Sequence, residues 1–415
     1  MPENGKEEYM EALASLRLSE KIHIAGFTRE ARFIAHCLAG TPDLPPPQLL
    51  AHQRSSVDQW GASQRKLTLK TKEGLQTSHE VLIPHYIGKS KSRYGVERPR
   101  LKHVANLIIS TVDKAVVPTL LSLRDSINQD TTICLLTPGM GVVEHLCKCV
   151  FPDPTTRPTF ILAHSTHSII RDPSNPDDQY SLQFVRGGKL ALSGLLPETQ
   201  ENRTEVDTWD RIARRARTQH FLKLLYTVPG LNATGLPMSK FLHEKLPSMI
   251  FSCVADAISV ALGFRYERIH EDKYGKRLWN NLFNETVAII SALPELEESP
   301  EIVEYFRGRN FSTEAMRYLQ TQSGVSQWIH MVKSGHRLPL QNLNGWFVTK
   351  AKEAGVKSVY HRGMINMIRA KEAARAEELK MDMPLYHSPY MLDSDCMRDE
   401  DEAARPARRL VYTNK

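Results

Sequence analysis

The chain has 415 residues and a formal net charge of +7, and this length is enough for two domains of ordinary size. It contains no apolar run close to the ~20 residues that cross a bilayer, which excludes a transmembrane segment at this stage. Its six cysteines are scattered, so we expect no disulfide framework and a reducing compartment. Cysteines and histidines also lack zinc-site spacing, and no metal is predicted. The excess of basic over acidic residues permits an anionic partner such as RNA or an acidic membrane surface.

The first motif is a strand, a tight turn and a helix between Ile22 and Leu38, with the sequence IHIAGFTREARFIAHCL. A dinucleotide-binding turn carries G-x-G-x-x-G at this place, and here the three positions are Gly26, Thr28 and Ala31. Thr28 puts a branched side chain where a phosphate should lie, and Glu30 competes with phosphate for the helix N-terminus. The motif predicts the architecture of a cofactor site with altered chemistry.

A second strand is predicted over residues 49–52. An acidic residue at its end would favour the ribose of NAD, whereas an arginine can accept the additional phosphate of NADP. The chain offers Arg54 and no acid at this place. Arg54 therefore indicates NADP, with a solvated loop arginine as the alternative.

A basic loop follows a region of short strands predicted over residues 64–86. Basic side chains with interleaved tyrosines suit phosphate contacts and base stacking, so nucleic acid is a candidate partner, and a solvated loop is the alternative. The basic residues of this loop are Lys89, Lys91, Arg93, Arg98, Arg100 and Lys102.

Strands at residues 106–112 and 131–136, with a helix between them, predict an α/β fold: a doubly wound, mainly parallel sheet covered by helices. Ligands of such sheets lie beyond the carboxyl ends of the strands. We therefore expect Gly26, Val112 and Pro138 to line one crevice.

The second half of the chain is predicted to be helical. Apolar spacing predicts helices over 210–226, 241–262, 274–293, 313–333, 343–352 and 360–380. We expect an N-terminal extension at 1–19, a Rossmann-like domain at 20–205, a helical domain at 206–375 and a disordered tail at 376–415.

Six stretches in order resemble the fungal branch of the ketopantoate reductase (2-dehydropantoate 2-reductase) family, from about residue 20 to 372. They are IHIAGFTREARFIAHCL, TTICLLTPGMGVVEHL, FPDPTTRPTFIL, HEKL, LPELEES and LNGWFVTKAKEAGV. The resemblance implies a Rossmann domain, a C-terminal all-α domain of the 6-phosphogluconate dehydrogenase type, and reduction of a 2-keto acid with NADPH.

The resemblance also implies site residues. The catalytic lysine of the family falls on Lys245, and a substrate-binding serine falls on Ser326. A cofactor-side asparagine is replaced by Pro138, which lacks both an amide side chain and a backbone N–H. The cofactor-binding positions are Gly26, Thr28, Ala31, Arg54 and Gly139.

A degenerate branch of this fold is more similar still: the fungal mitochondrial translational activators of cytochrome b mRNA. The similar stretches are TPGMGVVEHL, where that branch also has proline, then HEKL, SCVADAISVAL and LNGWFV. This resemblance implies a mitochondrial protein that binds mRNA or the mitoribosome, although MPENGKEEYMEAL does not resemble a cleavable presequence.

Three hypotheses remain open from the sequence. The first, which we favour at this stage, is a non-catalytic member of the fold acting in mitochondrial gene expression. The second is an active NADP-dependent 2-keto acid reductase, in the mitochondrion or the cytoplasm. The third is a pseudoenzyme that retains nucleotide binding as a structural or sensing feature.

Overall fold

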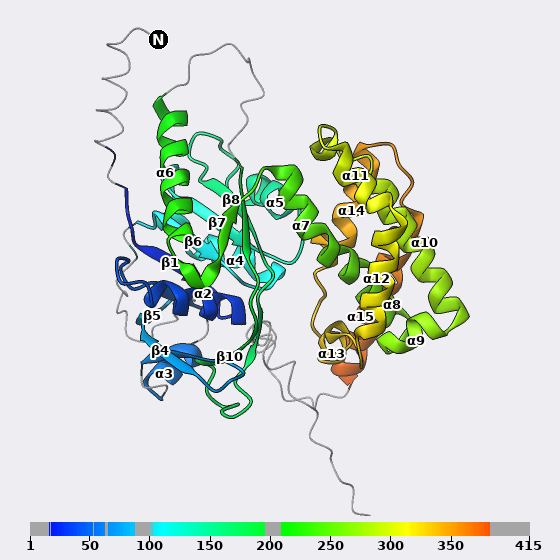
Figure 1. Ribbon diagram of the computed structural model, residues 1–415, viewed down its shortest axis with the longest axis horizontal. Coiled ribbons are helices and arrows are strands. Elements are labelled where there is room, and N and C mark those ends of the chain that lie inside the picture. Colours follow the sequence, from blue (N-terminus) through cyan, green and yellow to red (C-terminus); the bar gives the residue numbers. More distant parts are fainter. Residues whose placement is uncertain are drawn as a thin grey trace, which may run out of the picture. The chain divides into compact units, whose positions relative to one another are not determined.

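The computed structural model describes residues 16, 18–52, 54–62, 65–87, 101, 103–195 and 209–381. The chain divides between Lys245 and Leu246 into two compact units, the first built on β-sheets and the second helical (Figure 1). The predicted basic loop and the predicted domain boundary at 205–206 lie outside the described residues, as does most of the predicted N-terminal extension and tail.

The first unit contains an eight-stranded sheet with the order β12-β11-β8-β7-β6-β1-β2-β5. All neighbours are parallel except β8 and β11, so the predicted α/β class with a mainly parallel sheet is confirmed. The strands are β1 (Ile22–Ala25), β2 (Gln48–Ala51), β5 (Leu82–Tyr86), β6 (Asn106–Ile109), β7 (Thr132–Leu136), β8 (Thr159–Ser165), β11 (Leu190–Leu195) and β12 (Ala233–Gly235).

The strand order reverses between β1 and β6, because β2 lies on one side of β1 and β6 on the other. Ligands of open α/β sheets bind beyond the carboxyl ends of the strands at such a point. The fold therefore directs attention to the residues that follow β1, β6 and β7.

A second sheet has four strands in the order β4-β3-β10-β9. Its strands are β3 (Lys66–Lys70), β4 (Gln76–Glu80), β9 (Ser168–Arg171) and β10 (Ser181–Arg186). Two of them lie in the region where the sequence predicted short strands.

Helices cover both faces of the main sheet. They are α2 (Arg29–Ala39), α3 (Arg54–Ala62), α4 (Asp113–Ser122), α5 (Val142–Cys149) and α6 (Trp209–Tyr226), with short 3₁₀ turns η1 (Arg124–Ser126) and η2 (Pro229–Leu231). In α2, Phe33, Ile34 and Leu38 are buried as the periodicity predicts. Phe221 and Leu225 of α6 join the same apolar core as α2, so this helix belongs to the first unit although it follows the predicted boundary.

Helix α7 (Met238–Phe251) carries the chain from the first unit into the helical unit. The elements that follow are η3 (Ser252–Asp256), α8 (Ala257–Leu262), α9 (Tyr266–Glu271), α10 (Lys273–Ile290), η4 (Pro294–Leu296), α11 (Pro300–Arg307), α12 (Arg309–Thr321), α13 (Gln327–Lys333), η5 (Leu340–Asn342), α14 (Asn344–Glu353) and α15 (Val359–Met381). The helical class predicted for the C-terminal domain is confirmed, whereas the second unit begins at Leu246 and not at the predicted residue 206.

One predicted helix is wrong. The sequence predicted a single helix over 313–333, whereas α12 ends at Thr321 and α13 begins at Gln327. Gly324 adopts a φ of +87°, which side chains rarely adopt, and it breaks the helix. Ser326 then caps α13 with its side-chain oxygen.

The continuous helical stretch Met238–Leu262 has 25 residues and a mean hydropathy of 1.5, which is long and apolar enough to cross a bilayer. The expectation that the chain contains no apolar run of this length is therefore wrong for Met238–Leu262. However, 72% of its apolar window is buried inside the protein, as in the core helix of a soluble fold.

Several histidines are buried in the neutral form. Burial lowers the pKa of His23 to about 4, with a contribution from Lys21, and lowers that of His36 to about 4. His361 is fully buried, and burial lowers its pKa to about 3. Its Nε2 lies 2.9 Å from the Thr286 hydroxyl, which itself donates to a backbone carbonyl. His361 Nε2 therefore carries the proton, and Nδ1 accepts from the amide of Asn344 at 3.1 Å.

We expect the free energy of unfolding to fall as the pH is lowered from about 6.5 to about 4. The unfolded chain binds a proton at each of these histidines below its ordinary pKa, whereas the folded chain does not, and each contributes at most about 3 kcal/mol. Urea midpoints at pH 7 and pH 5 measure the effect. His36→Asn should make the decrease smaller, and His330→Gln at an exposed site should leave it unchanged. A pH-independent midpoint would contradict the burial argument.

Candidate functional site

The turn after β1 is held against the end of β6. Gly26 has a φ of +112°, and a Cβ built on it would meet the carbonyl oxygen of Ser110 at 2.0 Å. Any larger residue would have to push β1 and β6 apart. The structure thus gives the physical reason for the one glycine of the motif that this chain keeps.

Thr28 is the N-cap of α2. Its hydroxyl oxygen accepts from the backbone N–H of Ala31 at 3.1 Å and lies 2.5 Å from the hydroxyl oxygen of Ser110. Backbone N–H groups at a helix N-terminus are the groups that bind phosphate in dinucleotide folds. Thr28 therefore occupies one of those donors with its own side chain, while Ala31 is completely buried.

The two hydroxyl groups also supply a new donor. Thr28 and Ser110 carry two hydroxyl protons between them, and their mutual hydrogen bond uses one. The other proton can be donated to an anion that binds at the carboxyl ends of β1 and β6. A cofactor phosphate fits this chemistry, although the donor set differs from that of a three-glycine turn.

Arg32 fixes this turn to the rest of the unit, and sequence reasoning missed it. Its side chain is completely buried, its Nε donates to the carbonyl of Thr28 at 3.3 Å, and its guanidinium also donates to the carbonyl of Gln179. Arg32 lies between Ala31 and Phe33 on the apolar face of α2, and a charged residue at such a position could have indicated a buried, hydrogen-bonded side chain.

Lys245 is the best-supported candidate for chemistry. Its side chain is only 2% exposed, and its Nζ donates to the carbonyl oxygen of Thr137 at 2.6 Å. Thr137 directly follows β7, so the ammonium group is held at the carboxyl end of a central strand. In the adjoining loop, Pro138 is exposed, and Gly139 is buried with its carbonyl accepting from the Thr137 hydroxyl at 3.3 Å. Burying a charged lysine lowers the free energy of unfolding unless the charge is compensated, and buried titratable side chains recur at functional sites.

Two further groups surround Lys245. Glu244, the preceding residue of α7, forms an ion pair with Lys189 at 2.7 Å. His164, at the carboxyl end of β8, has its pKa lowered to about 3 by burial and by the charges of Lys245 and Lys189. His164 is therefore neutral at physiological pH, and sequence reasoning did not select it as a site residue.

Ser326 lies in the helical unit and is completely buried. Its hydroxyl donates to Asp256 Oδ1 at 2.7 Å and accepts from the backbone N–H of Trp328 at 3.1 Å. Tyr266 donates to the same Asp256 oxygen at 2.5 Å. Because the single hydroxyl proton of Ser326 is already donated, a substrate could accept it only if Asp256 released it. Its role as a substrate ligand stays a prediction.

Asp256 ends η3, a π-helical turn, and π-turns recur at functional sites. Burial raises the pKa of this carboxyl group, and hydrogen bonds from Tyr266, Ser326 and Ser252 act against the increase. Asn344 donates to the carbonyl of Cys253 in the same turn at 2.9 Å. The polar groups of this turn are thus held from three other segments of the helical unit.

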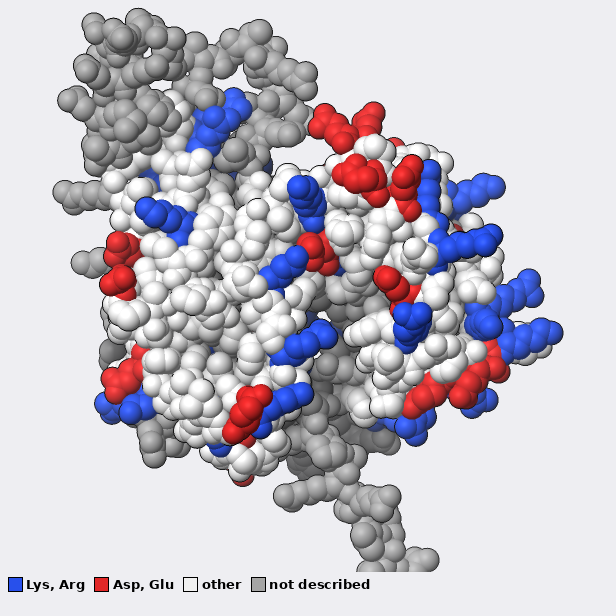
Figure 2. Space-filling model, in the orientation of Figure 1, with Lys and Arg blue, Asp and Glu red and all other residues white. Residues whose placement is uncertain are grey.

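Some predicted residues cannot be assessed. The backbone of Arg54 begins α3, but its side chain is outside the described part of the structure. The six basic candidates for RNA binding also lie there: Lys89, Lys91, Arg93, Arg98, Arg100 and Lys102. On the face drawn in Figure 2, described basic and acidic side chains are interspersed. Among the described residues, no group of three or more potential ligands is arranged to hold a metal.

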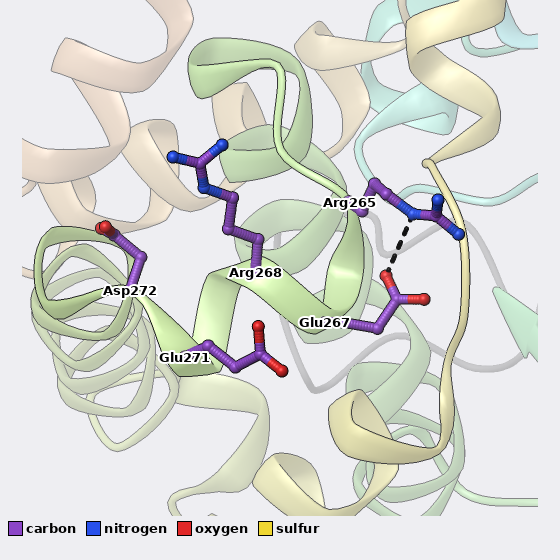
Figure 3. Close-up of a pocket in the computed structure, with 5 residues that line it drawn as sticks. All are labelled: Arg265, Glu267, Arg268, Glu271 and Asp272. Atoms are coloured by element: carbon purple, nitrogen blue, oxygen red, sulfur yellow. Dashed lines mark ion pairs between the residues drawn. The ribbon is translucent and has the colours of Figure 1, made fainter.

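A shallow depression of about 420 Å³ lies on α9 in the helical unit (Figure 3). Two of its lining residues, Arg265 and Glu267, form an ion pair at 3.5 Å. However, Glu267 accepts from the backbone N–H of Gly324, and Asp272 caps α10. These carboxylates stabilise the backbone, so the depression is a weaker candidate than the turn between β1 and α2 and the buried Lys245. Its lining residues are Arg265, Glu267, Arg268, Glu271 and Asp272.

Residues 240–372 match the family model of the C-terminal domain of ketopantoate reductases (PanE/ApbA). This part of the chain is similar to that domain. The match begins at Lys240 in α7, and it therefore includes Lys245 and Ser326. No curated protein sequence matches the chain.

Solved structures extend the likeness to the whole fold. A probable 2-dehydropantoate 2-reductase from Bacillus subtilis is similar at 14% identity and a TM-score of 0.54, covering 85% of this chain and 99% of that one. A ketopantoate reductase from Ralstonia eutropha JMP134 has 12% identity and a TM-score of 0.59, covering 86% and 99%. A D-mandelate dehydrogenase with NADH and anilino(oxo)acetate has 14% identity and a TM-score of 0.59, covering 86% and 99%. The Rossmann-like sheet plus helical domain of ketopantoate reductases is thereby confirmed; the likeness to a fungal or translational-activator branch stays a prediction.

We expect Ser326→Ala to lower the free energy of unfolding by about 1–3 kcal/mol, because Asp256 loses a buried donor and α13 loses its cap. Urea unfolding measures this change. Ser334→Ala, at the exposed end of the same helix, should change the free energy by less than about 0.5 kcal/mol. Equal stability of the two variants would show that the bonds of Ser326 are unimportant to the fold and would favour a purely substrate-binding role.

Proposed function

We propose that the protein is an NADP(H)-dependent reductase of 2-keto acids, of the ketopantoate reductase type, in which Lys245 supplies the proton. The observation that carries the proposal is the burial of Lys245 and its hydrogen bond to Thr137 at the carboxyl end of β7. The family match of residues 240–372, which includes this lysine, supports it.

The nicotinamide cofactor would supply the hydride when bound. The residues of the first unit that would hold it are Gly26, through its close turn, and the Thr28 and Ser110 hydroxyl pair, through its available proton. Similar solved structures include a D-mandelate dehydrogenase with NADH, and the alteration of the turn does not remove every donor. NADP rather than NAD is our expectation, on the evidence of Arg54 in the sequence.

The chemistry left to the chain is proton transfer and charge stabilisation. Reduction of a carbonyl group develops negative charge on its oxygen, which must be protonated. The Lys245 ammonium group can donate this proton, and its hydrogen bond to Thr137 holds it in one orientation. A side chain fixed before reaction costs no reorganisation during it.

Lys245→Met should leave NADPH binding within about twofold and lower kcat/KM for ketopantoate by about 100-fold or more, the typical contribution of a positioned acid. Stopped-flow or steady-state NADPH oxidation measures the rate, and calorimetry measures the binding. Lys240→Met, an exposed change on the same helix, is the matched control and should retain activity. Wild-type protein that binds NADPH but reduces no 2-keto acid would favour the sensing hypothesis.

A second candidate function is a non-catalytic one, in mitochondrial gene expression. Two observations favour loss of catalysis: Thr28 caps a helix N-terminus that would otherwise bind phosphate, and Ser326 has no free hydroxyl proton. In this proposal the partner is a mitochondrial mRNA such as that of cytochrome b, or the mitoribosome, at the matrix side of the inner membrane. The basic loop in the sequence is the proposed contact.

The second function predicts salt-sensitive RNA binding. Changing Lys89, Lys91 and Arg93 together to alanine should lower the affinity for RNA. The slope of the logarithm of the binding constant against the logarithm of the salt concentration should become shallower by about two to three, because fewer counterions are released. Filter binding or anisotropy at 50 and 200 mM salt measures both quantities. A matched triple change on the exposed face of the helical unit, at Lys273, Lys276 and Arg277, should have less effect. Absence of NADPH binding at millimolar concentration together with loop-dependent RNA binding would replace the reductase proposal.

A further inference from the structure

His52 lies at the carboxyl end of β2, beside the turn that follows β1. The two strands are parallel with Ala25 opposite Leu50, and the backbone N–H of Gly26 donates to the carbonyl of Leu50 at 3.2 Å. His52 directly follows Ala51, the last residue of β2, and it is half-buried. It therefore lies at the edge of the sheet where ligands of open α/β folds bind.

Hydrogen bonds to α4 determine which ring nitrogen of His52 carries the proton. The hydroxyl group of Thr119 donates its single proton to the carbonyl of Ala115 at 2.6 Å. Its oxygen lies 2.7 Å from His52 Nε2, so Nε2 carries a proton and donates it to Thr119. Burial lowers the pKa of His52, which favours the neutral ring. Nδ1 is then an acceptor with a lone pair.

This lone pair is open to a ligand. Within the described part of the chain, Nδ1 has no hydrogen-bond partner, and the only polar contact of the His52 side chain is the one with Thr119. Nδ1 is also absent from the buried polar atoms that lack a partner there, so solvent reaches it. Thr119 is completely buried, and it anchors the opposite end of the ring. The acceptor is thus both accessible and fixed in orientation.

The surroundings of His52 are apolar. On the side of β5, the backbone N–H of Ile87 donates to the carbonyl of Ala51 at 2.8 Å, which places Ile87 beside His52. Ile87 packs against the same apolar cluster as Leu50 and, from α4, Val116. An apolar surface with a single acceptor suits a ligand group that combines an apolar ring with a hydrogen-bond donor.

The acceptor character of Nδ1 restricts the chemistry of that ligand. A phosphate group of a cofactor offers acceptor oxygens and no proton at neutral pH, so the neutral ring would not bind it through Nδ1. Dinucleotide-binding folds place the adenosine ribose at the end of the second strand, where an acidic side chain accepts a hydrogen bond from a ribose hydroxyl group. This chain has no acid at that place, and His52 supplies an acceptor there instead.

We infer that His52 is a cofactor-binding residue whose Nδ1 accepts a hydrogen bond from a hydroxyl group of the adenosine ribose. The inference deepens the proposed function and rests on its cofactor site. NAD carries both ribose hydroxyl groups and NADP retains the 3′-hydroxyl, so the contact is available to either cofactor. No covalent bond forms or breaks, and the imidazole keeps its proton on Nε2 throughout.

The experiment compares the binding of ADP and 2′,3′-dideoxy-ADP to the full-length protein by calorimetry. The two nucleotides differ only in the ribose hydroxyl groups. We expect the wild-type protein to bind ADP about 3- to 10-fold more tightly, as one hydrogen bond between neutral groups allows. His52→Leu should reduce this preference to less than about twofold. His145→Leu, at an exposed position on α5, is the matched control and should retain it.

Two further measurements separate ligand binding from a structural effect of the substitution. His52→Asn keeps an acceptor oxygen close to the position of Nδ1 and should retain most of the preference for ADP. If His52→Leu does not fold, the ¹⁵N signal of Nδ1 in the wild-type protein reports the contact directly. ADP should shift this signal, and 2′,3′-dideoxy-ADP should leave it nearly unchanged.

Equal affinity of the wild-type protein for the two nucleotides, or a preference that persists in His52→Leu, would overturn the inference. So would a Nδ1 signal that ADP does not shift. A ribose preference that depends on His52, without oxidation of NADPH by any 2-keto acid, would keep the inference and overturn the proposed reductase. Turnover of ketopantoate without a ribose preference would do the reverse.

Discussion

The hydrogen bond from Lys245 to Thr137 is the interaction on which the candidate site depends. An ammonium group that is 2% exposed is destabilising unless its protons are accepted, and the carbonyl at the end of β7 accepts one at 2.6 Å. The same bond ties α7 to the loop that contains Gly139. Because α7 continues into the helical unit, the candidate proton donor belongs to the helix that connects the two units.

The first turn illustrates how one substitution changes a site without changing its fold. Gly26 remains because the carbonyl of Ser110 leaves no room for a side chain. Thr28 replaces a glycine and uses its hydroxyl group to cap the helix and to contact Ser110. The backbone path of a dinucleotide-binding unit is thereby preserved, whereas the groups offered to a phosphate change from backbone N–H groups to hydroxyl groups.

A network of buried hydrogen bonds joins several segments of the helical unit, although Asn344 Oδ1 has no hydrogen-bond partner in it. Asp256 is surrounded by hydroxyl donors, and Asn344 links the π-turn to the neutral His361. Such networks specify a unique packing only if nearly every member is satisfied. Ser326 matches a substrate-binding position of the family, but its hydroxyl group has only one proton to donate, and Asp256 accepts it. Its hydrogen bonds therefore stabilise the fold.

The sequence by itself determined the α/β class, the strand–turn–helix at Gly26 and the helical second half, because hydrophobic periodicity and glycine placement are local properties. It also selected Lys245, through a family pattern. Only the tertiary structure decided that Lys245 is buried against Thr137, that Ser326 is bonded to Asp256, and that His164 and Lys189 lie beside Lys245. These contacts join residues up to 108 positions apart in sequence, and strand register and helix packing, which create them, leave no local signal.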